Sequence, residues 1–148
     1  MHRVFQEDRT QTMSRDAQQI KTAPDPFEPF YISQAFRAGN LVYTSGQAAL
    51  SLEGDLVGID DFDAQAEQTF ENLRAVLRAA GSDLDKVIKV TIYLTDMSHF
   101  PRIVELREQW FTAPYPADTI VEVSGLALPE LMIEIEAIAL VDGKTLGA

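Results

Sequence analysis

Cysteine is absent from the sequence, although the chain is 148 residues long. Its absence excludes disulfide bonds, zinc sites built from thiolates and catalytic thiols. With 46% hydrophobic residues, a chain of this length can bury one core and is too short for two, so we expect a single domain held together by burial. The lack of cysteine also fits a cytoplasmic protein.

Long hydrophobic runs are missing as well. No stretch reaches the roughly 18 consecutive apolar residues that indicate a membrane-spanning helix. The first stretch, MHRVFQEDRTQTMSRD, is polar and of mixed charge, and it lacks the apolar segment of a secretory signal. We therefore expect a cytoplasmic protein that has no membrane partner.

Basic residues are scarce, because 12 Lys and Arg stand against 23 Asp and Glu, giving a formal net charge of −11. This charge repels phosphate backbones, so nucleic acid is not expected as a partner. The sequence also lacks a GxSxG elbow, a glycine-rich phosphate loop, an HExxH helix and a DxDxDG-type loop. No metal site is expected, and His2 and His99 are interpreted as surface residues.

Proline and glycine divide the chain into an arm and a domain. Residues 1–26 show neither a helical nor a strand period, and prolines punctuate their end, so they are predicted to form a flexible N-terminal arm. One domain is predicted over residues 27–148. It opens with two strands, ISQAF and LVYTSGQ, which are joined by a tight hairpin turn at residues 38–40.

Hydrophobic spacing predicts two helices. The first follows the acidic residues 60–63 and stops at Gly81, and its apolar face carries Ala66, Phe70, Leu73, Leu77 and Ala80. The second is predicted from Ser98 to Phe111, with Ser98 as its cap. Trp110 and Phe111, at its end, are interpreted as core or interface aromatics.

Alternation of apolar and polar residues predicts three further strands, KVIKVTIYLTD, ADTIVEVS and LMIEIEAIAL. One face of the first is expected to carry Ile88, Val90, Ile92 and Leu94. The order ββαβαββ predicts an α+β fold with one mixed sheet and both helices on one face. The other face needs cover, so we expect a homo-oligomer in which another copy hides it.

Four carboxylates on the last two predicted strands are candidate chemical groups. Alternation places Asp118 with Glu122 on one strand face and Glu134 with Glu136 on the other strand's face. If these faces coincide, the four groups are neighbours, and like charge in a dry site would raise a carboxyl pKa into the range useful for proton transfer. The alternative is that they point into water or pair with basic side chains at a subunit contact.

A glycine turn ends the second predicted strand, at Ser45-Gly46-Gln47. Such a turn exposes backbone N–H groups, which are suited to hold a carbonyl or carboxylate oxygen. The turn is therefore a second candidate feature.

Three segments together resemble the Rid (YjgF/RidA) family in order and spacing: ISQAFRAGNLVYTSGQ, QTFENLRAVLRAAGSDLDKVIKVTIYLTDM and IVEVSGLALPELMIEIEAIA. The resemblance covers about Phe30 to Val141. It implies a chorismate-mutase-like α+β fold, a homotrimer whose sheets line a central barrel, and a small-molecule cleft at each subunit interface. Members of the best-known subgroup hydrolyse enamines and imines to keto acids and ammonia without a cofactor, so no cofactor is expected. The family is also labelled endoribonuclease L-PSP, and the negative charge gives that activity no support.

The resemblance places a substrate-binding arginine after Pro-Ala, where this chain has Asp118. A carboxylate cannot replace a guanidinium fork, and it would repel an acidic substrate. Ile32, preceded by Tyr31, takes the place of the family's tyrosine, and Val104 that of its asparagine. Glu134 matches the acid that positions or activates the attacking water. The implied substrate-binding set is Tyr31, Ile32, Ser45, Gly46, Gln47, Val104, Asp118 and Ile120.

Two functional hypotheses follow. In the first, the chain is a divergent imine or enamine hydrolase in which Glu134 is a general acid or base and Asp118 binds an amine, hydroxyl or iminium group. In the second, the trimer keeps the cleft for a small ligand or a regulatory partner and performs no turnover. The enzyme hypothesis requires Glu134 to lie within hydrogen-bond reach of a pocket that excludes bulk water, whereas a fully solvated Glu134, or one locked to a basic side chain, favours the binding hypothesis.

Overall fold

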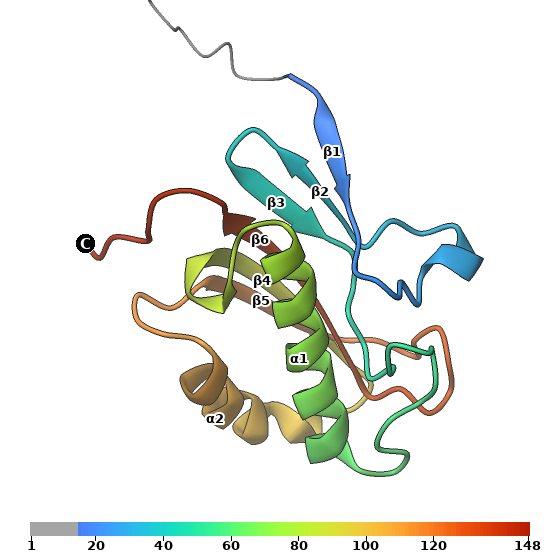
Figure 1. The fold of residues 1–148 in the computed structure, drawn as a ribbon. Coiled ribbons are helices and arrows are strands. Elements are labelled where there is room, and N and C mark those ends of the chain that lie inside the picture. Colours follow the sequence, from blue (N-terminus) through green and yellow to red (C-terminus); the bar gives the residue numbers. More distant parts are fainter. Residues whose placement is uncertain (1–14) are drawn as a thin grey trace, which may run out of the picture.

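A computed structural model describes residues 15–148 as one mixed sheet with two helices packed on it (Figure 1). Residues 1–14, which make up more than half of the predicted arm, lie outside the described residues. The elements are β1 (Ala17–Ile20), η1 (Glu28–Phe30), β2 (Ala35–Ala38), β3 (Leu41–Thr44), α1 (Phe62–Ala79), η2 (Leu84–Lys86), β4 (Val87–Leu94), η3 (Met97–His99), α2 (Phe100–Trp110), β5 (Ala117–Glu122) and β6 (Ile133–Leu140).

The sheet has six strands in the order β1-β2-β3-β6-β4-β5. Only β4 and β5 run parallel, and the connection between them contains α2. The other neighbouring strands are antiparallel, and α1 and α2 lie on the same side of the sheet (Figure 1). The predicted α+β fold with both helices on one face is therefore confirmed. No helix among residues 15–148 is long and apolar enough to span a membrane.

The core lies between this helix layer and the sheet. Phe70, Leu73 and Leu77, all predicted for the apolar face of α1, are completely buried. They belong to the same cluster as the inward side chains of the two central strands, which include Ile92, Leu94, Ile133 and Ile135. Burying one such side chain contributes roughly 2 kcal/mol, so this layer holds the sheet in one orientation.

The predicted hairpin is present between β2 and β3. Ala38 pairs with Leu41, which leaves Gly39 and Asn40 as the turn. Gly39 has a φ of 59°, a left-handed conformation that glycine adopts without steric cost. β2 begins three residues later than predicted, at Ala35.

The prediction that residues 1–26 lack regular structure is wrong for Ala17–Ile20. These four residues form β1, which pairs with β2 in antiparallel register from Ala17↔Ala38 to Ile20↔Ala35. The sequence of β1, AQQI, is short and mostly exposed, so it has no hydrophobic alternation to reveal it. Backbone hydrogen bonding to a neighbouring strand, rather than burial, forms this edge strand.

Two other element predictions are corrected. Ile88 is 37% exposed instead of facing the core, because a register shift between Val87 and Lys89 gives the inward position to Val87. The second helix begins at Phe100 rather than at Ser98. Asp96 is the cap of the short helix η3, and its side chain accepts a hydrogen bond from the Ser98 N–H at 2.8 Å.

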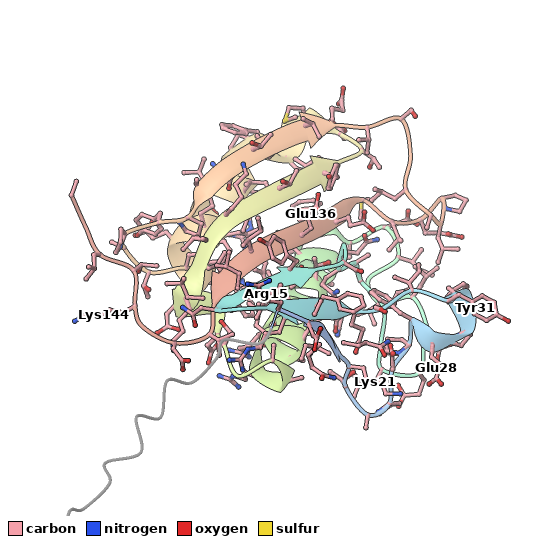
Figure 2. All side chains as sticks on the ribbon, turned by 90° about the horizontal axis from the view of Figure 1, so that it is seen from above. Arg15, Lys21, Glu28, Tyr31, Glu136 and Lys144 are labelled. Atoms are coloured by element: carbon pink, nitrogen blue, oxygen red, sulfur yellow. The ribbon has the colours of Figure 1, made fainter. Side chains whose placement is uncertain are left out.

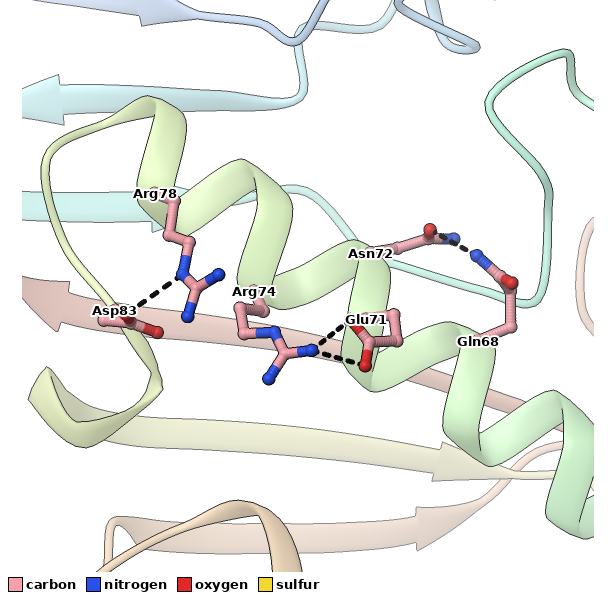
Figure 3. A network of polar contacts seen from close by, with 6 residues as sticks. All are labelled: Gln68, Glu71, Asn72, Arg74, Arg78 and Asp83. Atoms are coloured by element: carbon pink, nitrogen blue, oxygen red, sulfur yellow. Dashed lines mark hydrogen bonds and ion pairs between the residues drawn. The ribbon is translucent and has the colours of Figure 1, made fainter.

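Side chains of α1 also fix the loops that carry the Ser-Gly-Gln turn. The Asn72 Nδ2 donates to the carbonyl oxygens of Ala48 and Leu50, each at 2.8 Å, and Gln68 holds the Asn72 amide in place (Figure 3). The other contacts in this network lie along the helix surface and its end, and they join Glu71 with Arg74 and Arg78 with Asp83 (Figure 3).

Gln65 of α1 is a completely buried polar side chain. Its Nε2 donates to the carbonyl oxygens of Gly58, at 3.1 Å, and Glu130, at 2.8 Å. Its Oε1 accepts from the Met132 N–H at 2.9 Å. One amide therefore joins α1 to the loop that precedes it and to the segment that leads into β6.

We predict that Gln65→Leu lowers the free energy of unfolding by about 3 kcal/mol, because three backbone groups lose their partner. Urea denaturation followed by circular dichroism measures the loss. Gln68→Leu is the matched control, since the Gln68 amide bonds to Asn72 within the same helix and is only partly buried. Equal losses in both variants would contradict the role of Gln65.

Candidate functional site

The sheet separates the four candidate carboxylates into two pairs. Asp118 and Glu122 are register partners of Val90 and Leu94, which face the helices. Glu134 and Glu136 are opposite Tyr93 and Thr91, on the face without helices, which we call the open face. The condition that the two strand faces coincide is not met, so the predicted neighbourhood of four carboxylates is wrong.

Glu134 lies where strand β3 leaves its regular register with β6. Tyr43 pairs with Ile138, but the next bridge joins Gln47 to Ile135 through two backbone hydrogen bonds of 2.8 and 2.9 Å. The register therefore slips by one residue between these pairs, which is the geometry of a β-bulge. The Thr44 Oγ1 accepts a hydrogen bond from the Ala137 N–H at 3.0 Å and so satisfies an amide that faces the bulge.

The bulge places Gly46 directly against the Glu134 side chain. A Cβ atom on Gly46 would lie 2.6 Å from the Glu134 Cδ and 2.8 Å from its Oε2. Real Cβ atoms do not come this close to other heavy atoms, so only glycine fits here without displacing the carboxyl group. The structure thus brings together Glu134 and the predicted Ser45-Gly46-Gln47 turn.

The turn itself is held by the fold. The Ser45 N–H donates to the Gln34 carbonyl at 2.8 Å, and the Gln47 N–H donates to Ile135. The Gln47 Nε2 donates back to the Ser45 carbonyl at 3.1 Å. Of the three backbone N–H groups predicted to hold a substrate oxygen, those of Ser45 and Gln47 are therefore already engaged, which leaves at most that of Gly46.

Glu134 is partly buried, and its surroundings favour the protonated acid. Burial is the largest cause that raises the pKa of Glu134, and the negative charge of Glu136 raises it further. Tyr93 donates its O–H to Glu136, and this bond is the main reason why the pKa of Tyr93 is raised to about 12. The open face therefore contains a carboxyl group with a raised pKa, next to a phenol that stays protonated.

A shallow cavity of about 270 Å³ lies beside Glu136 on the open face, and neither Glu134 nor Tyr93 is among its lining residues. Figure 2 shows Glu136 in the middle of the sheet, on β6. Three neighbouring strands, β3, β4 and β6, line the cavity with Tyr43, Thr44, Lys89, Thr91, Glu136, Ala137 and Ile138. It offers space for a small molecule or for side chains of another copy.

Asp118 belongs to a different group, between α2 and the edge strand β5. The Arg107 guanidinium forks onto it, with Nε–Oδ2 and Nη2–Oδ1 distances of 2.9 and 3.0 Å. Both side chains are largely buried, with exposed fractions of 25% for Arg107 and 16% for Asp118. Val104, on α2, is half exposed, and Ile120 of β5 is partly buried. Within one chain, these residues face the opposite side of the sheet from Glu134.

Tyr31 and Ile32 join neither group within the chain. Tyr31 follows η1 in a left-handed conformation, with φ of 58°, and is 99% exposed. Ile32 is 48% exposed. Among residues 15–148, no set of three or more His, Asp or Glu side chains is arranged to hold a metal ion.

Two site residues were missed by the sequence analysis. Tyr93 was hidden because only the strand register shows that it faces Glu134. Arg107 lies on the second helix, and its partner Asp118 is eleven positions away on a strand. The basic residues that lie within reach of a strand carboxylate can be identified only when the fold is known.

The profile of the Endoribonuclease L-PSP family matches residues 20–141. A RutC family protein of Pyrococcus horikoshii is 41% identical over 119 residues, which cover 80% of this chain and 92% of that protein. The 2-iminobutanoate/2-iminopropanoate deaminase of Dermatophagoides farinae is 33% identical over 120 residues, which cover 81% and 91%. The crystal structure of RidA from an Antarctic Psychrobacter is 40% identical with a TM-score of 0.76, covering 83% of this chain and 98% of that one.

We predict that Gly46→Ala lowers the free energy of unfolding by about 1 kcal/mol or less, because the new methyl group overlaps the Glu134 carboxyl, which is the end of a flexible side chain and can move aside. Most of this loss should disappear when Gly46→Ala is combined with Glu134→Ala. Thermal denaturation of the single and double variants measures the coupling. Gly125→Ala is the matched control, since a Cβ there meets nothing within 4 Å. Additive losses at positions 46 and 134 would contradict the contact.

Proposed function

The chain belongs to the endoribonuclease L-PSP (Rid) family, and we propose that it is a divergent hydrolase of small imines and enamines. The observation that carries the proposal is the Glu134 carboxyl, which is partly buried against Gly46 and has a raised pKa. A raised pKa makes the carboxyl a better candidate for proton transfer than an ordinary solvated glutamate. Relatives named as a deaminase and as reactive intermediate deaminase A support the reaction class.

The proposed reaction uses Glu134 in both directions. The protonated carboxyl gives its proton to the imine nitrogen, and water adds to the adjacent carbon while the Glu134 carboxylate accepts one of the water's protons. Transfer of that proton to the nitrogen converts it into a leaving amine. The C–N bond breaks and the C=O bond forms as the hydroxyl proton returns to the Glu134 carboxylate, which restores the starting acid. A carbonyl compound and ammonia are released, so no oxidant or cofactor is consumed.

The electrostatic setting of Glu134 favours this proposal over a binding protein without turnover. A carboxylate that serves only structure is usually paired with a basic side chain or fully solvated. Among residues 15–148, the ion pairs involve Arg74, Arg78, Arg102 and Arg107, and none of them reaches Glu134. Glu134 is also partly removed from water.

We further propose that the cleft is completed by another copy in a homotrimer. Glu134 and Gly46 lie on the open face, whereas Asp118, Ile120 and Val104 lie on the helix side of β5. A single chain cannot bring these groups to one substrate, but a head-to-tail ring joins the two different surfaces at every interface. Apolar side chains exposed on the open face support such contact; they include Phe36, Tyr43 and Val121.

The substrate preference is proposed to differ from that of relatives with an arginine at the position of Asp118. Asp118 uses both carboxylate oxygens on Arg107, so it is not a free anion for a cationic substrate. The pair also offers less net positive charge than an unshared guanidinium. We therefore propose small neutral imines as the preferred substrates, ahead of acidic or basic ones.

We predict that the protein accelerates ammonia release from freshly generated imines of neutral amino acids. Glu134→Gln is expected to lose roughly a hundredfold or more in kcat, because its amide cannot donate and accept the proton. Asp118→Arg should shift the preference towards acidic imines by adding positive charge. If no imine is accelerated by the wild type or by Asp118→Arg, the hydrolase proposal fails and the binding hypothesis is favoured.

We also predict that two inactive variants restore each other's activity. Co-expression of Glu134→Gln with Arg107→Ala mixes the copies, and some interfaces then combine an intact Glu134 with an intact Arg107. With random mixing of equal amounts, about a quarter of the clefts are intact, so the ammonia assay should recover about a quarter of the wild-type activity. Each variant alone is the control, after size-exclusion chromatography confirms its assembly. No recovery in a mixed assembly would contradict a shared cleft.

A further inference from the structure

Tyr93 makes a diagonal contact across the open face that the strand register alone would not produce. Its direct register partner on β6 is Glu134, whereas Glu136 is opposite Thr91. The Tyr93 hydroxyl nevertheless donates to the Glu136 Oε1. Diagonal neighbours on an antiparallel pair are within reach of aromatic side chains. Tyr93 therefore lies against one carboxylate and is hydrogen-bonded to the other.

This contact makes the two carboxylates unequal. They are two residues apart on one face of β6, at roughly 6–7 Å, so both cannot be ionised without mutual repulsion. With a pKa raised to about 12, the phenol of Tyr93 stays a donor throughout the physiological range. Its hydrogen bond therefore holds the Glu136 carboxyl group in a fixed position beside Glu134.

The other surroundings reinforce the inequality. Lys89 of β4 lines the cavity together with Glu136, and its Nζ donates to the Thr119 hydroxyl on β5 at 2.6 Å. Tyr43 of β3 lines the same cavity. Gly46 covers the Glu134 carboxyl from the β3 side, so that group loses water without gaining a charged partner. Lys89 thus lines the same cavity as Glu136, whereas Glu134 is closely packed against Gly46.

We propose that Tyr93 and Glu136 are positioning residues for Glu134: the Tyr93 hydroxyl holds the Glu136 carboxyl beside Glu134, and this neighbour helps Glu134 to act as the acid. The inference rests on the proposed function where it assigns the Glu134 proton to catalysis. The titration of Glu134 is a property of the resting protein, and it can be measured without any substrate.

The test is a carboxyl ¹³C NMR titration of the protein labelled at glutamate, with Glu134 assigned from the spectrum of Glu134→Gln. Glu136→Gln should move the Glu134 midpoint to lower pH, because it removes the neighbouring negative charge. Tyr93→Phe should also move the Glu134 midpoint to lower pH, because the Glu136 carboxyl is no longer held beside it. Tyr43→Phe, which removes a phenol from the same face, is the control. Unchanged midpoints in both test variants would overturn the proposal.

Kinetics provide a second measurement. If Glu134 must be protonated, kcat falls as pH rises through its pKa, and a lower pKa moves this decline to lower pH. Glu136→Gln and Tyr93→Phe should therefore each move the decline of kcat to lower pH, with little change in KM. If the Glu134 midpoint shifts but the pH dependence of kcat does not, the catalytic assignment is overturned. A wild type without turnover would overturn the proposed function, while the titration still decides whether Glu136 acts on Glu134.

Discussion

The contact between Gly46 and Glu134 is the constraint on which the candidate site depends. A carboxyl group can lie this close to the backbone because position 46 has no side chain and because the register of β3 slips along β6. The slip is maintained by the Gln47–Ile135 bridge and by the Thr44 hydroxyl bound to Ala137. The same packing removes water from Glu134 and raises its pKa, so backbone geometry and acidity have one cause.

The two faces of the sheet have different roles. Its helix side is a packed core, and at the edge of that side the Arg107–Asp118 pair joins α2 to β5. Its open face carries polar and aromatic side chains and a shallow cavity. A site that needs groups from both sides must be assembled from two copies, which is why assembly and activity are linked in our proposal.

The Arg107–Asp118 pair shows that the charge of a sequence position depends on its partners in the fold. The sequence analysis treated Asp118 as an unpaired anion. In the folded chain, the Arg107 guanidinium of α2 pairs with it through two hydrogen bonds. The expected consequence for substrates changes accordingly, from attraction of cationic groups to tolerance of neutral ones.

Much of the fold was determined by local patterns in the sequence. The period of α1, the hairpin at Gly39 and the alternation of β6 each follow from side chains that must be buried or turned, so the α+β architecture was predictable. Glu134 and the glycine turn were placed in one site by the family resemblance and not by these patterns. β1 was not predicted, because an edge strand is formed by backbone hydrogen bonds to its neighbour and needs few apolar residues. The faces of Asp118 and Glu134, the partner of Asp118 and the contact of Tyr93 with Glu136 were decided by tertiary structure, because strand order, register and a bulge determine which distant side chains meet.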